Sequence, residues 1–120
     1  MKVAVSAQGP LLSSVVDGRF GRAAWFIISD TGTGEFQAVK NDQNLAAAQG
    51  AGIQSAQLVV NQGAQAVLTG HCGPKAFRVL KAAGIRIYVG VDGAVSNALE
   101  KFNAGSLEEA AEADVEGHWA

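Results

Sequence analysis

The sequence has one cysteine, two prolines and no block of basic side chains among its 120 residues. One cysteine excludes an internal disulfide, and it leaves too few thiolates to build an iron–sulfur cluster in place, which normally takes four. No apolar run is long enough to span a bilayer and no secretory leader is visible, so we expect a cytoplasmic protein with a reduced thiol and no membrane partner. A net charge of −2 argues against nucleic acid as a partner.

A chain of this length can form one domain without disulfide or metal support, because it can bury about two thirds of its unfolded surface. The 15 glycines stand mostly between periodic segments and indicate tight turns. No linker or internal repeat is present. We therefore predict a single domain over residues 1–120, with a mobile tail from about residue 113 to residue 120.

Strand-like and helical patterns alternate along the chain. Apolar residues at helical spacing predict helices near residues 53–63, 74–84 and 95–105, and the first helix places Ile53, Ala56 and Val60 on one face. Ser106 and Glu109 have the spacing of a capping box, which predicts a fourth, short helix. The predicted strands are residues 2–7, 25–29, 35–39, 66–69 and 85–89.

This order predicts an α/β fold. Residues 31–34 separate two strand-like runs and predict an N-terminal antiparallel hairpin, whereas strands that alternate with helices predict parallel pairs with helices on both faces. We therefore expect a mixed five-stranded sheet. If the first strand lies beside strand 66–69, their carboxyl ends form a crevice of the kind that binds ligands in open α/β sheets. The predicted lining of this crevice is Gln8, Gly9, Gly70 and His71.

Residues 70–75, which we call the cysteine loop, join a buried strand to a helix. Gly73 can take backbone angles that other residues resist, and Pro74 suits the first helical position because its missing N–H would have no partner there. The next N–H groups, on Lys75 and Ala76, should point out of the helix start with the positive end of its dipole behind them, and Lys75 adds a charge. Such a loop attracts an anion.

His71 and Cys72 stand side by side in this loop. An imidazole and a thiol can ligate copper or another soft metal. A loop cysteine can equally be a small buried residue, and the histidine can be structural. Adjacent residues of an extended chain point in opposite directions, so joint ligation of one ion needs a bent loop. Both interpretations stay open at this point.

A second cationic segment precedes strand 25–29. Arg19 and Arg22 flank Phe20 in residues 17–22, which we call the arginine loop. Either this loop is solvated, with Phe20 anchored in the core and both charges merely exposed, or it folds over the crevice and a guanidinium group faces an anion. The local density of arginine favours the second interpretation.

His71, Cys72 and Arg78 also reproduce the HCx5R spacing of cysteine-dependent phosphatases, in which loop amides and the arginine hold a phosphate that the thiolate attacks. Pro74 removes one amide from such a cradle, and Val79 replaces the hydroxyl residue that usually follows the arginine. No acid with a partner is evident. A binding protein is therefore the preferred interpretation, and the phosphatase is the alternative.

Several short motifs are spread over nearly the whole chain, namely RFGRA at 19–23, GAG at 50–52, GPKAF at 73–77 and AGI at 83–85. In this combination the sequence resembles the dinitrogenase iron-molybdenum cofactor biosynthesis family, and it is most similar to the small stand-alone members, some of which carry a molybdenum–copper sulfide cluster. The resemblance implies a ribonuclease H-like three-layer fold and a non-enzymatic role. That role is to bind or carry a preformed metal–sulfide cluster, either of the molybdenum–copper type or an iron–molybdenum cofactor precursor. It also implies proteins that deliver or receive the cluster.

The residue types suit such a ligand. An anionic thiometallate that already has its own sulfide ligands needs cationic side chains and N–H donors rather than several thiolates. We expect no catalytic residue. The predicted cluster-binding residues are Arg19, Arg22, Gly70, His71, Cys72, Gly73, Pro74 and Lys75, with Cys72 and His71 as optional metal ligands.

Overall fold

The computed structural model describes residues 1–41 and 50–113, so the tail predicted to be mobile lies outside it from residue 114 onward. A five-stranded sheet has the order β3-β2-β1-β4-β5. β1 and β5 are parallel to β4, whereas β2 is antiparallel to β1 and β3, so the predicted mixed α/β sheet is confirmed. The ribonuclease H-like label stays a prediction. The strands are β1 (Lys2–Ala7), β2 (Trp25–Asp30), β3 (Phe36–Lys40), β4 (Ala66–Leu68) and β5 (Arg86–Tyr88).

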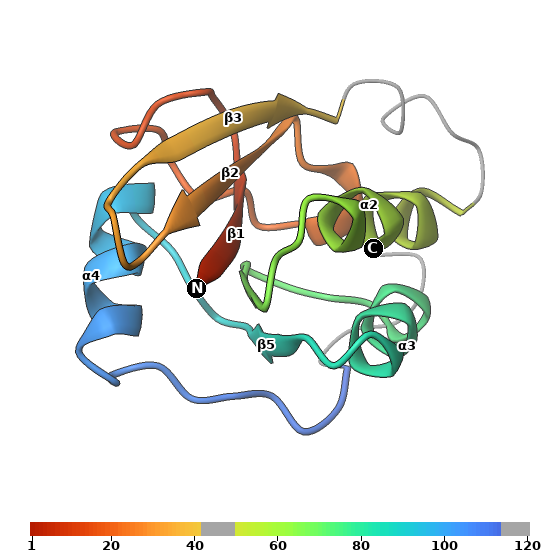
Figure 1. Cartoon of the computed structure of the whole chain (residues 1–120). Coiled ribbons are helices and arrows are strands. Elements are labelled where there is room, and N and C mark those ends of the chain that lie inside the picture. The colour runs from red at the N-terminus through yellow and green to blue at the C-terminus, as the bar shows by residue number, and fades with distance from the viewer. Residues whose placement is uncertain (42–49, 114–120) are drawn as a thin grey trace.

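Helices cover both faces of the sheet. Figure 1 shows α2 (Ala51–Asn61) and α3 (Pro74–Ala82) on one face and α4 (Val95–Asn103) on the other. β1 can be central because alternate residues are apolar on both faces: Val3 belongs to the core beneath α4, and Ala4 to the core beneath α2 and α3. Within the described residues, no helix is long and apolar enough to cross a membrane.

Helix α2 turns small residues toward the core. Ala56 is fully buried and half-buried Val60 packs against the core, as predicted, whereas Ile53 is 39% exposed, so the prediction is wrong for Ile53. Small side chains let α2 pack closely on α3 and on the short 3-10 helix η1 (Phe20–Arg22). The buried residues of α2 are Ala51, Gly52, Ser55, Ala56 and Val59.

The segment 106–113 contains no helix, contrary to the capping-box prediction. It lies along the outer edge of β5, where the Ala110 N–H donates to the Ile87 carbonyl at 2.7 Å. The Glu109 carboxylate lies 3.5 Å from Lys81 Nζ and does not cap a helix. Hydrogen bonding to a strand edge therefore outweighs the local helix signal.

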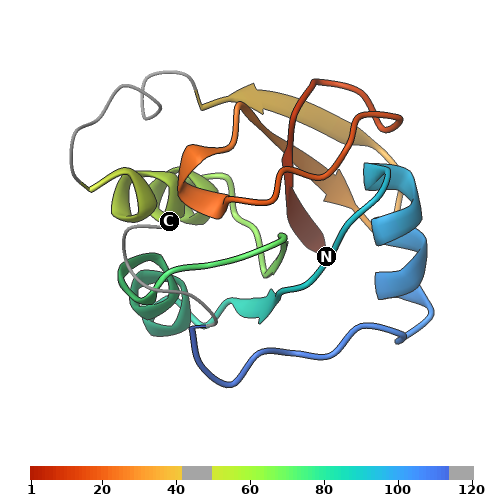
Figure 2. The same ribbon diagram turned by 180° about the vertical axis from the view of Figure 1, so that it is seen from behind.

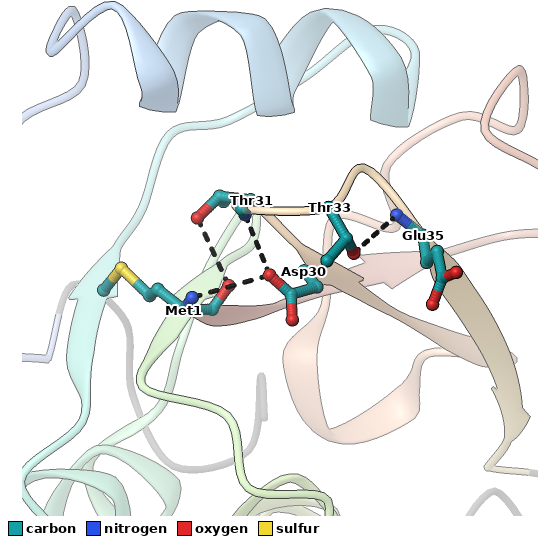
Figure 3. A network of polar contacts seen from close by, with 6 residues as sticks. Met1, Asp30, Thr31, Thr33 and Glu35 are labelled. Carbon is teal, nitrogen blue, oxygen red and sulfur yellow. Dashed lines mark hydrogen bonds and ion pairs between the residues drawn. The ribbon is translucent and has the colours of Figure 1, made fainter.

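A polar turn joins β2 to the antiparallel β3 (Figure 3). The Gly32 N–H donates to Asp30 Oδ1 at 2.8 Å, and this hydrogen bond, with the Met1 amino group 3.6 Å from the same oxygen, lowers the pKa of the Asp30 carboxyl. The Thr31 N–H donates to the Met1 carbonyl at 2.9 Å. The turn is therefore bound to the amino end of β1 by a hydrogen bond and an ion pair, at the end of the sheet opposite to the cysteine loop.

Candidate functional site

The arginine loop and the cysteine loop lie side by side at the carboxyl ends of β1 and β4. Arg19 and His71 form a parallel bridge between the two loops. The Phe20 N–H donates to the His71 carbonyl at 3.1 Å, which fixes the register of this contact. Two segments that are far apart in the sequence therefore present their side chains on one surface.

The contact between the loops depends on the absence of a side chain at Gly70. A Cβ atom built there would lie 2.6 Å from the Gly18 Cα and 2.7 Å from the Gly18 carbonyl oxygen, both backbone atoms. Gly70 is buried, whereas a Cβ on Gly18 would meet nothing within 4 Å. The close approach of the two backbones therefore needs glycine at position 70 but not at position 18.

The chain itself fills the crevice that was predicted between the ends of β1 and β4. The Asp17 N–H donates to the Ser6 carbonyl at 2.8 Å, and the Ser6 hydroxyl donates to the Asp17 carbonyl at 2.9 Å. Ser6 Oγ is also hydrogen bonded to Thr69 Oγ1 at 2.7 Å, and both side chains are fully buried. Hydrogen bonds with the preceding strand hold the arginine loop in this position, so the candidate surface is the outside of the two loops rather than a cleft beside Gln8.

Phe20 anchors the arginine loop in the core. Its side chain is fully buried, and its ring centroid lies 5.2 Å from that of Phe26 in β2. On either side of this anchor Arg19 is exposed and Arg22 is half-buried. The predicted Phe20 anchor is confirmed, and it holds Arg19 beside His71; that a guanidinium group of this loop faces an anion stays a prediction.

Helix α3 begins where the sequence predicts, with Pro74 in its first turn and the Phe77 N–H donating to the Gly73 carbonyl at 3.0 Å. Gly73 has φ −76° and ψ 168°, which any residue can adopt, so the predicted need for glycine angles there is wrong. Within the part of the chain that the structure describes, the N–H groups of Lys75 and Ala76 have no hydrogen-bond acceptor. Ala76 is fully buried, so of these two donors only the Lys75 N–H belongs to an exposed residue, and it stands with the Lys75 ammonium group at the positive end of the α3 dipole.

Cys72 and His71 lie in different environments. The Cys72 side chain is fully buried in the core beneath α2 and α3, and its Sγ lies 3.7 Å from the Gly73 carbonyl oxygen. His71 is exposed. In this conformation the thiol cannot contact a ligand on the outer surface, so the geometry favours packing over metal ligation for Cys72. Across residues 1–41 and 50–113, no group of three His, Cys, Asp or Glu side chains is placed to hold a metal ion.

The phosphatase alternative does not match the geometry. Cys72 is buried, and Arg78 lies on the exposed face of α3, because the helix already starts at Pro74. A phosphate cradle needs an accessible thiolate and an arginine that folds over the same loop. Neither requirement is met here.

Sequence reasoning missed three groups that shape this surface. The Asp17 carboxylate accepts a hydrogen bond from the Arg19 N–H at 3.1 Å, and an Asp-Gly pair before the arginine was the available signal. Asn41, directly after β3, and Ser55, on α2, are also buried; Ser55 is hydrogen bonded to Gly21 in the arginine loop, and Asn41 to Ala23 directly after it. Nothing local marks these two positions as buried.

Comparisons with known proteins agree over most of the chain. The family model described as dinitrogenase iron-molybdenum cofactor matches residues 1–105. An uncharacterized protein of Methanocaldococcus jannaschii is 32% identical over 110 residues, which is 90% of each chain. The structure of the apo form of the orange protein from Desulfovibrio gigas is 40% identical, with a TM-score of 0.93 over 95% of this chain and 96% of that chain. An NMR structure of a Thermotoga protein assigned to the DUF35 family is 39% identical, with a TM-score of 0.83 over 97% of this chain and 98% of that chain.

Proposed function

Because this chain belongs to the dinitrogenase iron-molybdenum cofactor family, we propose that it binds and carries a preformed, anionic metal–sulfide cluster on the surface made by the arginine and cysteine loops. The cargo is a molybdenum-containing cluster, of either the molybdenum–copper or the iron–molybdenum type. The structure of the Desulfovibrio gigas relative is described as an apo form, which implies that this relative binds a ligand. The proposal extends ligand binding to this chain.

One observation carries the proposal. The surface combines two exposed cationic side chains, Arg19 and Lys75, with the Lys75 N–H, which lacks an acceptor among the described residues, and its one thiol is buried. Such a surface offers charge and hydrogen bonds but hardly any metal ligands. It suits a cluster that arrives with its sulfide ligands in place, and it does not suit assembly of a cluster from bare ions.

The role is non-catalytic carriage. The protein would take the cluster from one protein and give it to another, and binding through hydrogen bonds and charge permits such release because no metal–protein bond has to break. Arg22 and His71 are the remaining groups on this surface that can contact the cargo, and Gly70, Gly73 and Pro74 shape the backbone around it.

A titration tests the proposal. Apoprotein is mixed with tetrathiomolybdate, with and without copper(I), and the charge-transfer absorption of the thiometallate is followed with increasing ligand. We expect a coloured complex of defined stoichiometry whose affinity falls as sodium chloride rises, because complementary charge is screened by salt. A stoichiometric complex that is insensitive to salt, or the absence of any complex, would contradict the proposal.

Replacement of Cys72 by serine separates electrostatic capture from ligation. We expect Cys72→Ser to keep the stoichiometry and to change the affinity less than about threefold, because the thiol is buried away from the surface. The same titration measures this, with circular dichroism as the check that the variant is folded. Loss of colour in a folded Cys72→Ser protein would instead make Cys72 a metal ligand.

A further inference from the structure

A buried polar network connects the arginine loop to helix α2 and to the end of β3. Asn41, directly after β3, and Ser55, on α2, are both fully buried. Asn41 Nδ2 lies 2.9 Å from the Ala23 carbonyl oxygen and 3.0 Å from Ser55 Oγ, and Ser55 Oγ lies 3.1 Å from the Gly21 carbonyl oxygen. The Asn41 N–H also donates to the Ala24 carbonyl at 3.0 Å.

The direction of each hydrogen bond in this network follows from the groups involved. A carbonyl oxygen only accepts, so the Asn41 amide must donate to Ala23, and the Ser55 hydroxyl must donate its single hydrogen to Gly21. Ser55 Oγ is then the acceptor for the second Asn41 N–H. These three hydrogen bonds therefore each have one defined direction.

The network acts on the part of the arginine loop that carries the charges. Gly21 and Ala23 are the chain neighbours of Arg22, and Gly21 is buried against α2. Figure 2 shows the short helix η1, in orange, beside the start of α2. The N–H groups of Asp17 and Phe20 hold the first half of the loop, through the carbonyls of Ser6 and His71. In residues 21–23 the backbone supplies longer hydrogen bonds, 3.3 Å from Arg22 to Arg19 and 3.4 Å from Ala23 to Phe20, and the side chains of Ser55 and Asn41 add to them.

We infer that Asn41 and Ser55 are positioning residues for cluster binding: they hold the arginine loop in its binding conformation before the ligand arrives. The inference rests on the proposed function for its ligand. If the loop were held loosely, only a fraction of the molecules would present both arginines, and the apparent dissociation constant would rise by the inverse of that fraction. Preorganisation by buried side chains thus tunes affinity without any contact with the cluster.

The test compares two variants. Ser55→Ala removes the hydroxyl that joins Asn41 to Gly21, and Leu99→Ala, on α4 at the other face of the sheet, destabilises the protein without touching the loop. The readouts are the dissociation constant for tetrathiomolybdate and the backbone order of Gly21, Arg22 and Ala23 from ¹⁵N relaxation without ligand. We expect a rigid loop in the wild type, a mobile loop with an affinity about tenfold lower in Ser55→Ala, and wild-type affinity in Leu99→Ala.

Three results would overturn the inference: a mobile loop in the wild type, a rigid loop with unchanged affinity in Ser55→Ala, or an equal loss of affinity in Leu99→Ala, which would attribute the effect to global stability. The relaxation measurement on the wild type needs no variant, so the inference can be tested even if Ser55→Ala does not fold. If the wild type binds no thiomolybdate, the proposed function fails, while the order of the loop still shows whether the network positions it.

Discussion

Replacement of Lys75 by glutamate is expected to weaken tetrathiomolybdate binding at least about 100-fold at low ionic strength. The ammonium group stands in the first turn of α3, at the positive end of its dipole, so its reversal turns the main attraction of the cysteine loop into a repulsion. Two unit charges close to a protein surface interact with about 1–4 kcal/mol before screening, and reversal of a charge counts this energy twice. The titration described above measures the change.

The substitution should leave the fold intact, which makes the experiment interpretable. A negative charge in the first turn of a helix is favourable by about 0.3–1 kcal/mol, so Lys75→Glu should be as stable as the wild type or slightly more stable. Lys101→Glu is the matched control, because it makes the same charge change on an exposed lysine in the last turn of α4. Equal loss of affinity in both variants would mean that net charge, rather than this site, attracts the anion.

Replacement of Gly70 by alanine is expected to disturb the fold and the site together. The new Cβ would lie 2.6 Å from a backbone atom of Gly18, which cannot move aside like the end of a flexible side chain. Overpacking of this kind costs about 1–3 kcal/mol, and here the strain must separate the two loops. We expect a lower midpoint in urea unfolding and, in the folded fraction, at least a tenfold loss of thiomolybdate affinity.

Gly18→Ala is the matched control for this experiment. It adds the same methyl group to the other side of the same contact, where nothing lies within 4 Å. Its stability should stay within about 0.5 kcal/mol of the wild type, as for most surface changes, and its affinity should be unchanged. If both alanine variants behaved alike, the loop contact would not depend on the missing side chain at Gly70.

The fold could be predicted largely because its signals are local. In the run KVAVSA the residues that point to either face of the sheet are mostly apolar, which indicated that β1 is a central strand. The glycines after α2 and α3 indicated where these helices end. The prediction failed where a tertiary contact outweighed a local signal. Segment 106–113 pairs with β5 despite its capping box, and on α2 the predicted core residue Ile53 is exposed while Ser55 is buried.

The site could be predicted only in its parts. The composition of the two loops predicted cationic side chains at the carboxyl ends of β1 and β4, and the structure has Arg19 and Lys75 exposed there. Whether they meet depends on the contact of Gly70 with Gly18, which joins residues far apart in the sequence. The same holds for Asn41 and Ser55, since a polar side chain in a polar context carries no sign that it will be buried. The roles of the predicted site residues remain proposals for experiment.

The central claim is that a finished thiometallate anion is held on the surface of the two loops by cationic side chains and by the backbone N–H of Lys75. Amide ¹H–¹⁵N chemical shifts, recorded as unlabelled tetrathiomolybdate is added to the ¹⁵N-labelled protein, test this claim most directly. The account predicts that the largest shift occurs at Lys75, with smaller ones in the arginine loop, and that the turn between β2 and β3 is unaffected. Shifts concentrated in that turn or on α4, with Lys75 unchanged, would contradict it.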